Sequence, residues 1–196
     1  MKKPKRKKRV STNRPMALKF RSKSMLALLL IVTFLVYAPG IQYDFVNWDD
    51  YQNVKENMGV QDLSVEGIKD IFSSTVMANY NPLPILTFAV EHHFFGMNPA
   101  VFHLNNILLH LICVVLVFFI CLRLGFRHAV AFITAGLFAL HPMRAESVVW
   151  ITERKDVLYA AFFFGAILSY LKYRSSEKTN WWFYGISLFL FAIALF

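Results

Sequence analysis

Two adjacent carboxylates, Asp49 and Asp50, are the residues of this sequence best suited to do chemistry. They follow an apolar run by a few residues, so a membrane helix ending there would hold them at the bilayer surface. A carboxylate at that surface could act as a general base between an acceptor from water and a reagent from lipid. An acid pair beside a membrane helix also occurs as a solvated loop or a helix cap, and the dipeptide alone favours that plainer interpretation.

A second cluster of charged residues lies later in the chain. Arg154 and Lys155 come just before another apolar run, at its external end. The positive-inside rule disfavours positive charge on that side, so the two cations need a negative partner. A lipid phosphate suits them, because Arg offers a planar fork of donors and Lys a point charge. The alternative is a structural network, in which three nearby acids neutralise the two cations: Glu146, Glu153 and Asp156.

Three polar residues, His103, Asn106 and His110, interrupt a long apolar run at spacings of three and four. This spacing places them on one face of a helix. Hydrogen bonding between helices is the favoured role for neutral His and Asn side chains inside a membrane. We predict no metal site, because no third ligand stands at a suitable spacing, and leave a divalent cation open.

The elements that must hold these residues are apolar helices. Of the 196 residues 57% are hydrophobic and only 17% are charged, which is too apolar for an ordinary soluble domain. A helix of about twenty residues crosses a bilayer. Five apolar runs therefore predict an all-helical, polytopic integral membrane protein with about five transmembrane helices: 25–41, 99–122, 129–140, 157–170 and 181–196.

The positive charge gathers in the first residues. Eleven Lys or Arg and no acid occur in residues 1–23, although the net charge of the whole chain is only +9. Such a tail is retained on the cytoplasmic side. We predict a basic cytoplasmic tail (1–24), a first transmembrane helix (25–41), an external loop (42–98) and further helices (99–196). A cleaved signal peptide and nucleic-acid binding by the tail are the weaker alternatives.

The external loop is expected to contain two interfacial helices. Ser64 can cap a helix that carries Val65, Ile68 and Phe72 on one face, which suits a helix on the membrane surface. Residues 82–95 form a second apolar run, broken by charged and polar residues near its end. Asn98 and Pro99 are typical of the cap and first position of the helix that follows. The chain ends inside an apolar run, and we expect a fragment of a longer protein.

Several motifs together resemble a known family. They are Trp48-Asp49-Asp50-Tyr51 and the segments 80–83, 95–99, 102–110, 137–142, 146–151 and 153–158. Their order and spacing resemble the membrane half of bacterial tetratricopeptide-repeat membrane proteins. Those are similar to the transmembrane and tetratricopeptide-repeat-containing O-mannosyltransferases of the GT-C superfamily. The resemblance implies a location in the bacterial cytoplasmic membrane, and the basic tail predicts that the N-terminus lies in the cytoplasm.

The resemblance also implies a reaction. It implies a glycosyltransferase that moves a sugar, with inversion, from a polyprenyl-phosphate-linked donor to a hydroxyl of a protein or glycan outside the membrane. Asp49 or Asp50 would be the general base. Binding of the departing lipid phosphate and lining of the site would fall to Arg154, Lys155, Glu146, His103 and His141.

Two departures and two competing functions remain open. Asn81 and Pro84 stand where relatives usually carry a bulky or basic residue and a small hydroxyl residue, so this corner of the site is expected to differ. The main competing function is a noncatalytic membrane anchor or scaffold for a repeat domain. A transporter ranks below it, because no intramembrane charge pair or broken helix is evident.

Overall fold

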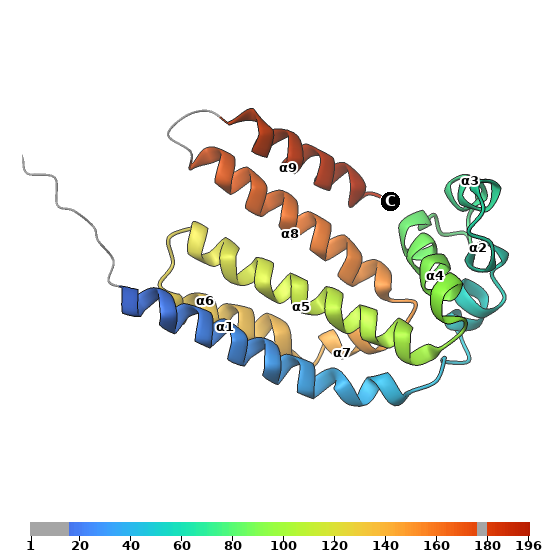
Figure 1. Cartoon of the computed structure of the whole chain (residues 1–196), viewed down its shortest axis with the longest axis horizontal. Helices are drawn as coiled ribbons and strands as arrows, with labels where there is room; N and C mark the ends of the chain where they lie inside the picture. The colour runs from blue at the N-terminus through green and yellow to red at the C-terminus, as the bar shows by residue number, and fades with distance from the viewer. Residues whose placement is uncertain (1–15, 176–179) are drawn as a thin grey trace, which may run out of the picture.

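The computed structural model describes residues 16–175 and 180–196, which form helices and connecting loops without a strand. Five helices run side by side along the long axis of the molecule (Figure 1). They are α1 (Met16–Tyr37), α5 (Pro99–Arg123), α6 (His128–Leu140), α8 (Arg154–Arg174) and α9 (Trp181–Ile193). The predicted all-helical fold is confirmed for this part of the chain. Residues 1–15, which hold most of the predicted basic tail, lie outside it.

Helix α5 is the centre of the bundle and packs against α1, α6 and α8. Its buried residues recur at helical spacing, from Phe102 near its start to Cys121 near its end. Helix α6 meets this core through Ala131, Ala135 and Ala139, which are fully buried one turn apart. Small residues four apart let helix backbones approach closely without large side chains between them.

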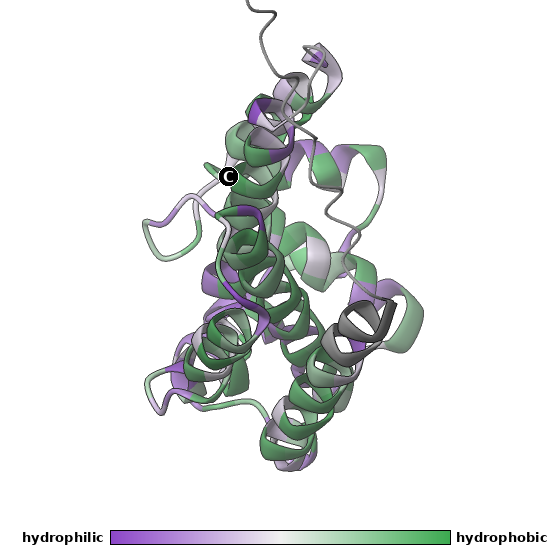
Figure 2. Ribbon diagram, turned by 90° about the vertical axis from the view of Figure 1, so that its left-hand side faces the viewer, coloured by the Kyte–Doolittle hydropathy of each residue, from purple (hydrophilic) through white to green (hydrophobic). Residues whose placement is uncertain are grey.

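Two helical segments are long and apolar enough to cross a membrane, Lys23–Gln42 and Pro99–Arg123. Helices α6 and α9 are apolar but shorter. Figure 2 shows the hydrophobic residues distributed along the bundle helices. The structure therefore supports a helical membrane protein, while the number of five spans stays a prediction.

The segment between α1 and α5 folds into a compact layer at one end of the bundle (Figure 1). The 3-10 turn η1 (Ala38–Gln42) leads into this layer, which contains a π turn and three helices: η2 (Tyr51–Lys55), α2 (Met58–Gln61), α3 (Val65–Ser73) and α4 (Pro82–Phe95). Its core is a cluster that includes Val54, Val60, Ile71, Ile85 and Phe88. We call this segment, residues 42–98, the end layer.

Local sequence signals explain where these helices begin. The Ser64 side chain accepts a hydrogen bond from the backbone of Gly67, and Asn98 does the same for Ala100 at the start of α5. Both predicted caps are confirmed. Helix α3 buries Gly67 and Ile71 against the end layer and leaves the predicted apolar face partly exposed, so contact of that face with a membrane stays a prediction.

The end layer shares its end of the bundle with the connection from α6 to α8, which contains α7 (Arg144–Val149). The α5–α6 connection, the last turn of α8 and the first turn of α9 lie at the opposite end (Figure 1). This arrangement brings the two candidate clusters of the sequence, around Asp49 and around Lys155, to the same end of the molecule.

Candidate functional site

Asp50 is completely buried and fully engaged. Its Oδ1 accepts hydrogen bonds from the backbone N–H of Thr152, at 3.0 Å, and from the Thr152 hydroxyl, while Oδ2 accepts one from the backbone of Val46 at 2.9 Å. The carboxylate thus ties the end layer to the segment before α8. Its geometry is that of a structural anchor, because no face of it is open to a substrate.

Asp49 is only partly buried and lines a small cavity of about 80 Å³. The same cavity is lined by Lys155 and by the carboxamides of Asn53, Asn79 and Asn81. We call it the junction cavity. An acid and a cation that were predicted as site residues from distant parts of the sequence, Asp49 and Lys155, thus line one cavity.

Lys155 stands in the first turn of α8. Its Nζ lies 2.9 Å from Oε1 of Glu153, and its side chain is 43% exposed. An ammonium group has three donors, so this ion pair leaves two of them for another partner. Lys155 is therefore placed to bind an anion without being buried.

Arg154, the neighbouring cation, is instead enclosed by protein. Its guanidinium donates to Oδ1 of Asn106 at 2.7 Å and to the carbonyl of Phe102 at 2.7 Å, and it forms an ion pair with Glu91. It also lies over the Phe88 ring, 4.3 Å from the centroid. These contacts join α4, α5 and α8, so Arg154 holds the first turn of α8 in place.

Glu91, the partner of Arg154, was not predicted as a site residue. Its Oε1 also accepts a hydrogen bond from Asn105 at 2.8 Å, but its buried Oε2 has no partner among the described residues. Burial raises the pKa of the Glu91 carboxyl group, and the charge of Arg154 opposes this shift. The signal in the sequence was a lone acid in an apolar helix.

The polar stripe of α5 is buried as expected from its spacing. Asn106 accepts a hydrogen bond from Arg154 of α8 at 2.7 Å, and the His110 ring lies 3.0 Å from the carbonyl of Ala139 in α6. The predicted hydrogen bonding between helices is confirmed for these two residues. His103 is buried beside the edge of the Tyr43 ring, and neither ring nitrogen has a hydrogen-bond partner in the described part of the chain.

The other two candidates, Glu146 and His141, are exposed and line neither the junction cavity nor the cavities next to it. Nδ1 of His141 accepts a hydrogen bond from the backbone of Met143 at 3.2 Å. The structure therefore gathers Asp49 and Lys155, builds Asp50 and Arg154 into the framework around them, and leaves Glu146 and His141 apart.

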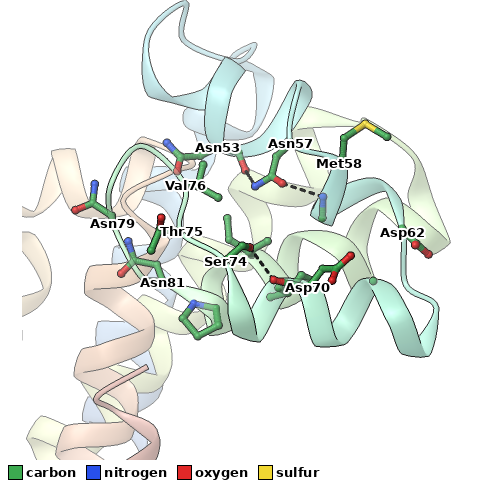
Figure 3. Close-up of a pocket in the computed structure, with 15 residues that line it drawn as sticks. Asn53, Asn57, Met58, Asp62, Asp70, Ser74, Thr75, Val76, Asn79 and Asn81 are labelled. Carbon is green, nitrogen blue, oxygen red and sulfur yellow. Dashed lines mark hydrogen bonds between the residues drawn. The ribbon is translucent and has the colours of Figure 1, made fainter.

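Two larger cavities adjoin the junction cavity. A groove of about 210 Å³ shares Asn81, Pro84 and Lys155 with it and continues along α8 past Leu158 and Phe162. We call this the α8 groove. On the other side lies a cavity of about 430 Å³ within the end layer, drawn in Figure 3, which shares three Asn residues with the junction cavity: Asn53, Asn79 and Asn81.

The sequence of the chain is similar to that of a group of known proteins. It is 36% identical over 154 residues to protein O-mannosyl-transferase TMTC1 of Homo sapiens and 31% identical over 192 residues to TMTC4 of the same organism. These alignments cover 74% and 84% of the chain. The chain belongs to the family of TMTC protein O-mannosyl-transferases. Mouse TMTC3, 32% identical over 117 residues and 59% of the chain, belongs to the same group of relatives.

The alignments cover only a small part of each TMTC protein. The chain spans 17% of the length of human TMTC1 and 26% of that of human TMTC4. No protein-family model and no solved structure matches it. The TMTC relationship and the two long apolar helices together support a membrane protein.

Proposed function

We propose that this chain carries the catalytic end of a glycosyltransferase that moves a sugar from a polyprenyl-phosphate-linked donor to a hydroxyl group of a protein. One observation carries the proposal: Asp49 and Lys155 line the same cavity at the end of an apolar helix bundle. An acid is needed to take the proton of the acceptor, and a cation to stabilise the departing phosphate. The name of the TMTC relatives agrees with a sugar donor and a protein acceptor.

The reaction is a single displacement. The acceptor oxygen attacks the anomeric carbon of the sugar, its proton passes to Asp49, and the bond between that carbon and the phosphate oxygen breaks. The polyprenyl phosphate leaves with an added negative charge, which the two remaining donors of Lys155 stabilise. Attack from the face opposite the leaving group inverts the anomeric carbon, as the predicted GT-C type of enzyme requires.

The α8 groove supports a lipid-linked donor. Lys155 stands at the boundary between this groove and the junction cavity, and apolar side chains such as Leu158 and Phe162 line the groove beyond it. A donor with its phosphate on Lys155 would place its sugar towards Asp49 and its first prenyl units along α8. Arg154 and Asp50 then act as positioning residues, because each fixes the segment that carries its reactive neighbour.

The proposal includes a location. The eleven basic residues before Ser24 support a cytoplasmic N-terminus. Because α1 runs from that end of the bundle to the end layer, the junction cavity would then face the outside of a bacterial cytoplasmic membrane.

Transfer of mannose from polyprenyl-phosphate mannose to a Ser- and Thr-containing peptide tests the function. In membranes carrying the protein, Asp49→Asn should lower the rate by about 10²- to 10⁴-fold, the usual contribution of a general base. Glu56→Gln, an exposed acid of the same layer outside the three cavities, is the matched control and should leave the rate unchanged. Normal transfer by folded Asp49→Asn protein would show that the base is assigned wrongly.

A noncatalytic membrane anchor is the competing function. The burial of Asp50 and Arg154 favours this function, because both residues stabilise the fold and neither lines the junction cavity. Absence of transfer from every polyprenyl-linked donor by the unmodified protein would favour this anchor over the enzyme.

A further inference from the structure

The large cavity of the end layer has no role in the proposed transfer step. It lies between η2, α2, α3 and the start of α4, and its lining is rich in side chains that both donate and accept hydrogen bonds. Four of them are carboxamides, Asn53, Asn57, Asn79 and Asn81. Figure 3 shows these residues around the opening beside Thr75. We call it the carboxamide cavity.

Three of the four carboxamides hydrogen-bond to the protein itself, and Asn79 does so by donating to the carbonyl of Met77 at 3.3 Å. Asn57 caps α2 by accepting from Gly59, and its Nδ2 donates to the carbonyl of Asn53 at 3.1 Å. Asn53 donates to the carbonyl of Asp49 at 2.9 Å and so tethers the proposed base to this wall. All three remain part of the lining, with Nδ2 of each already engaged in a hydrogen bond.

Asn81 is different. Its half-buried side chain makes no hydrogen bond with any other residue in the described ranges, and it is shared by the carboxamide cavity, the junction cavity and the α8 groove. A carboxamide offers two donors and an acceptor, which is the complement of a peptide group. A partner that binds Asn81 therefore lies within reach of both larger cavities.

The wall beside Asn81 has extended backbone. Ser74 is in the extended region, and Val76 pairs with Asn79 across a two-residue turn in which Met77 and Ala78 have φ of 50° and 60°. Two consecutive left-handed residues without glycine are strained, and such strain concentrates at functional sites. The backbone N–H and C=O groups of Thr75, the residue before this pair, make no backbone hydrogen bond in the described part of the chain. They are left for another extended segment to pair with.

The charge of the cavity limits the partner further. Asp62 and Asp70 are in the lining, which contains no Lys or Arg. A negative wall beside the Asn81 carboxamide favours a partner that supplies N–H and O–H donors and repels an anionic one. Donor phosphates are thereby directed away from this cavity and towards Lys155.

We propose that the carboxamide cavity binds the acceptor as an extended polypeptide segment, which pairs with the backbone at Thr75 and with Asn81 and presents a Ser or Thr hydroxyl to Asp49 through the junction cavity. This inference rests on the proposed function for the identity of the acceptor, but the binding can be measured without any transfer.

Photo-crosslinking of a peptide to the full chain in lipid nanodiscs tests the proposal. The probe is an uncharged peptide of alternating Thr and Val that carries a diazirine and a biotin. Labelling should map to residues 53–62 and 70–81, and Asn81→Leu and Asn79→Leu should each lower it by about fivefold. Gln52→Leu, an exposed carboxamide of the same layer outside the cavity, should label as the unmodified chain does. Thermal unfolding of each variant verifies that it is folded.

The outcomes separate the two proposals. Labelling that is unaffected in both folded Asn variants, or that maps outside the end layer, would overturn the acceptor cavity. Displacement of the peptide by a soluble oligosaccharide, but not by unlabelled peptide, would also overturn it in favour of a sugar site. Asn81-dependent labelling in Asp49→Asn protein supports the cavity whether or not transfer occurs, and transfer itself tests only the proposed function.

Discussion

Asp50 and Thr152 are 102 residues apart in the chain, and the buried carboxylate of the one accepts hydrogen bonds from both the backbone and the hydroxyl of the other. This contact closes the end layer onto the segment that begins α8. It fixes the residue before Asp50 and the residues after Thr152 relative to each other. The presence of Asp49 and Lys155 in the lining of one cavity is consistent with this contact.

Replacing Asp50 should therefore harm stability more than chemistry. In Asp50→Asn the Nδ2 group replaces one carboxylate oxygen, and both of these oxygens accept from a backbone N–H. Two donors then face each other, and the charge-assisted hydrogen bonds of the carboxylate, worth about 1.5–3 kcal/mol each, are lost. We expect a lower midpoint of thermal unfolding in nanodiscs than for Asp49→Asn. Equal midpoints for the two variants would contradict the assigned roles.

Replacing Lys155 should have the reverse effect. Lys155→Met keeps most of the length of the side chain and removes the charge, so transfer should fall by about 10²-fold or more while the unfolding midpoint changes little. Lys155→Arg should recover part of the rate. Lys69→Met removes an exposed lysine of α3 and serves as the control. A Lys155→Met protein with a normal rate would leave the phosphate without its proposed partner.

The buried pair of Arg154 and Glu91 predicts strong coupling between two substitutions. Arg154→Leu leaves the carboxylate of Glu91 buried and unpaired and should cost about 3–5 kcal/mol. The double variant with Glu91→Leu should cost less than the sum of the single variants, because it removes both charges. The same cycle on the exposed pair Lys69 and Glu66 should give a coupling below about 1 kcal/mol. Additive costs for the buried pair would argue against the ion pair.

The end layer should loosen in acid at the start of α3. Hydrogen bonds from the backbone and hydroxyl of Ser64 hold the pKa of Asp62 below its ordinary value of 3.8. A lowered carboxyl pKa stabilises the fold above 3.8, and this contribution is lost as the pH falls through the folded-state pKa. As the pH falls below the folded-state pKa of Asp62, hydrogen exchange of residues 62–73 should accelerate in the unmodified chain. The Asp62→Asn variant, measured at the same pH values, should not show this acceleration. Identical pH profiles for the two proteins would exclude this cause.

Much of the fold was predictable because its signals are local. Apolar runs of helical length predicted the five bundle helices, and Ser64 and Asn98 predicted two helix starts within a residue. Boundaries were less accurate. The predicted first helix, 25–41, corresponds to an α-helix that ends at Tyr37 and a 3-10 turn that contains Pro39, which cannot donate to the helical ladder.

The sequence by itself determined that this chain forms apolar helices with acids and cations near their ends, since hydropathy and spacing are properties of short segments. Only the tertiary structure decided which of the neighbours Asp49 and Asp50, and which of Arg154 and Lys155, lines a cavity and which is buried in the framework. Asp50 and Arg154 are buried and Asp49 and Lys155 line a cavity because the partners that enclose the first two come from distant segments. Adjacent residues of the same type carry no local signal that distinguishes them. The carboxamide cavity was unpredictable for the same reason, because its lining exists only once α3, α4 and the turn at Met77 have packed together.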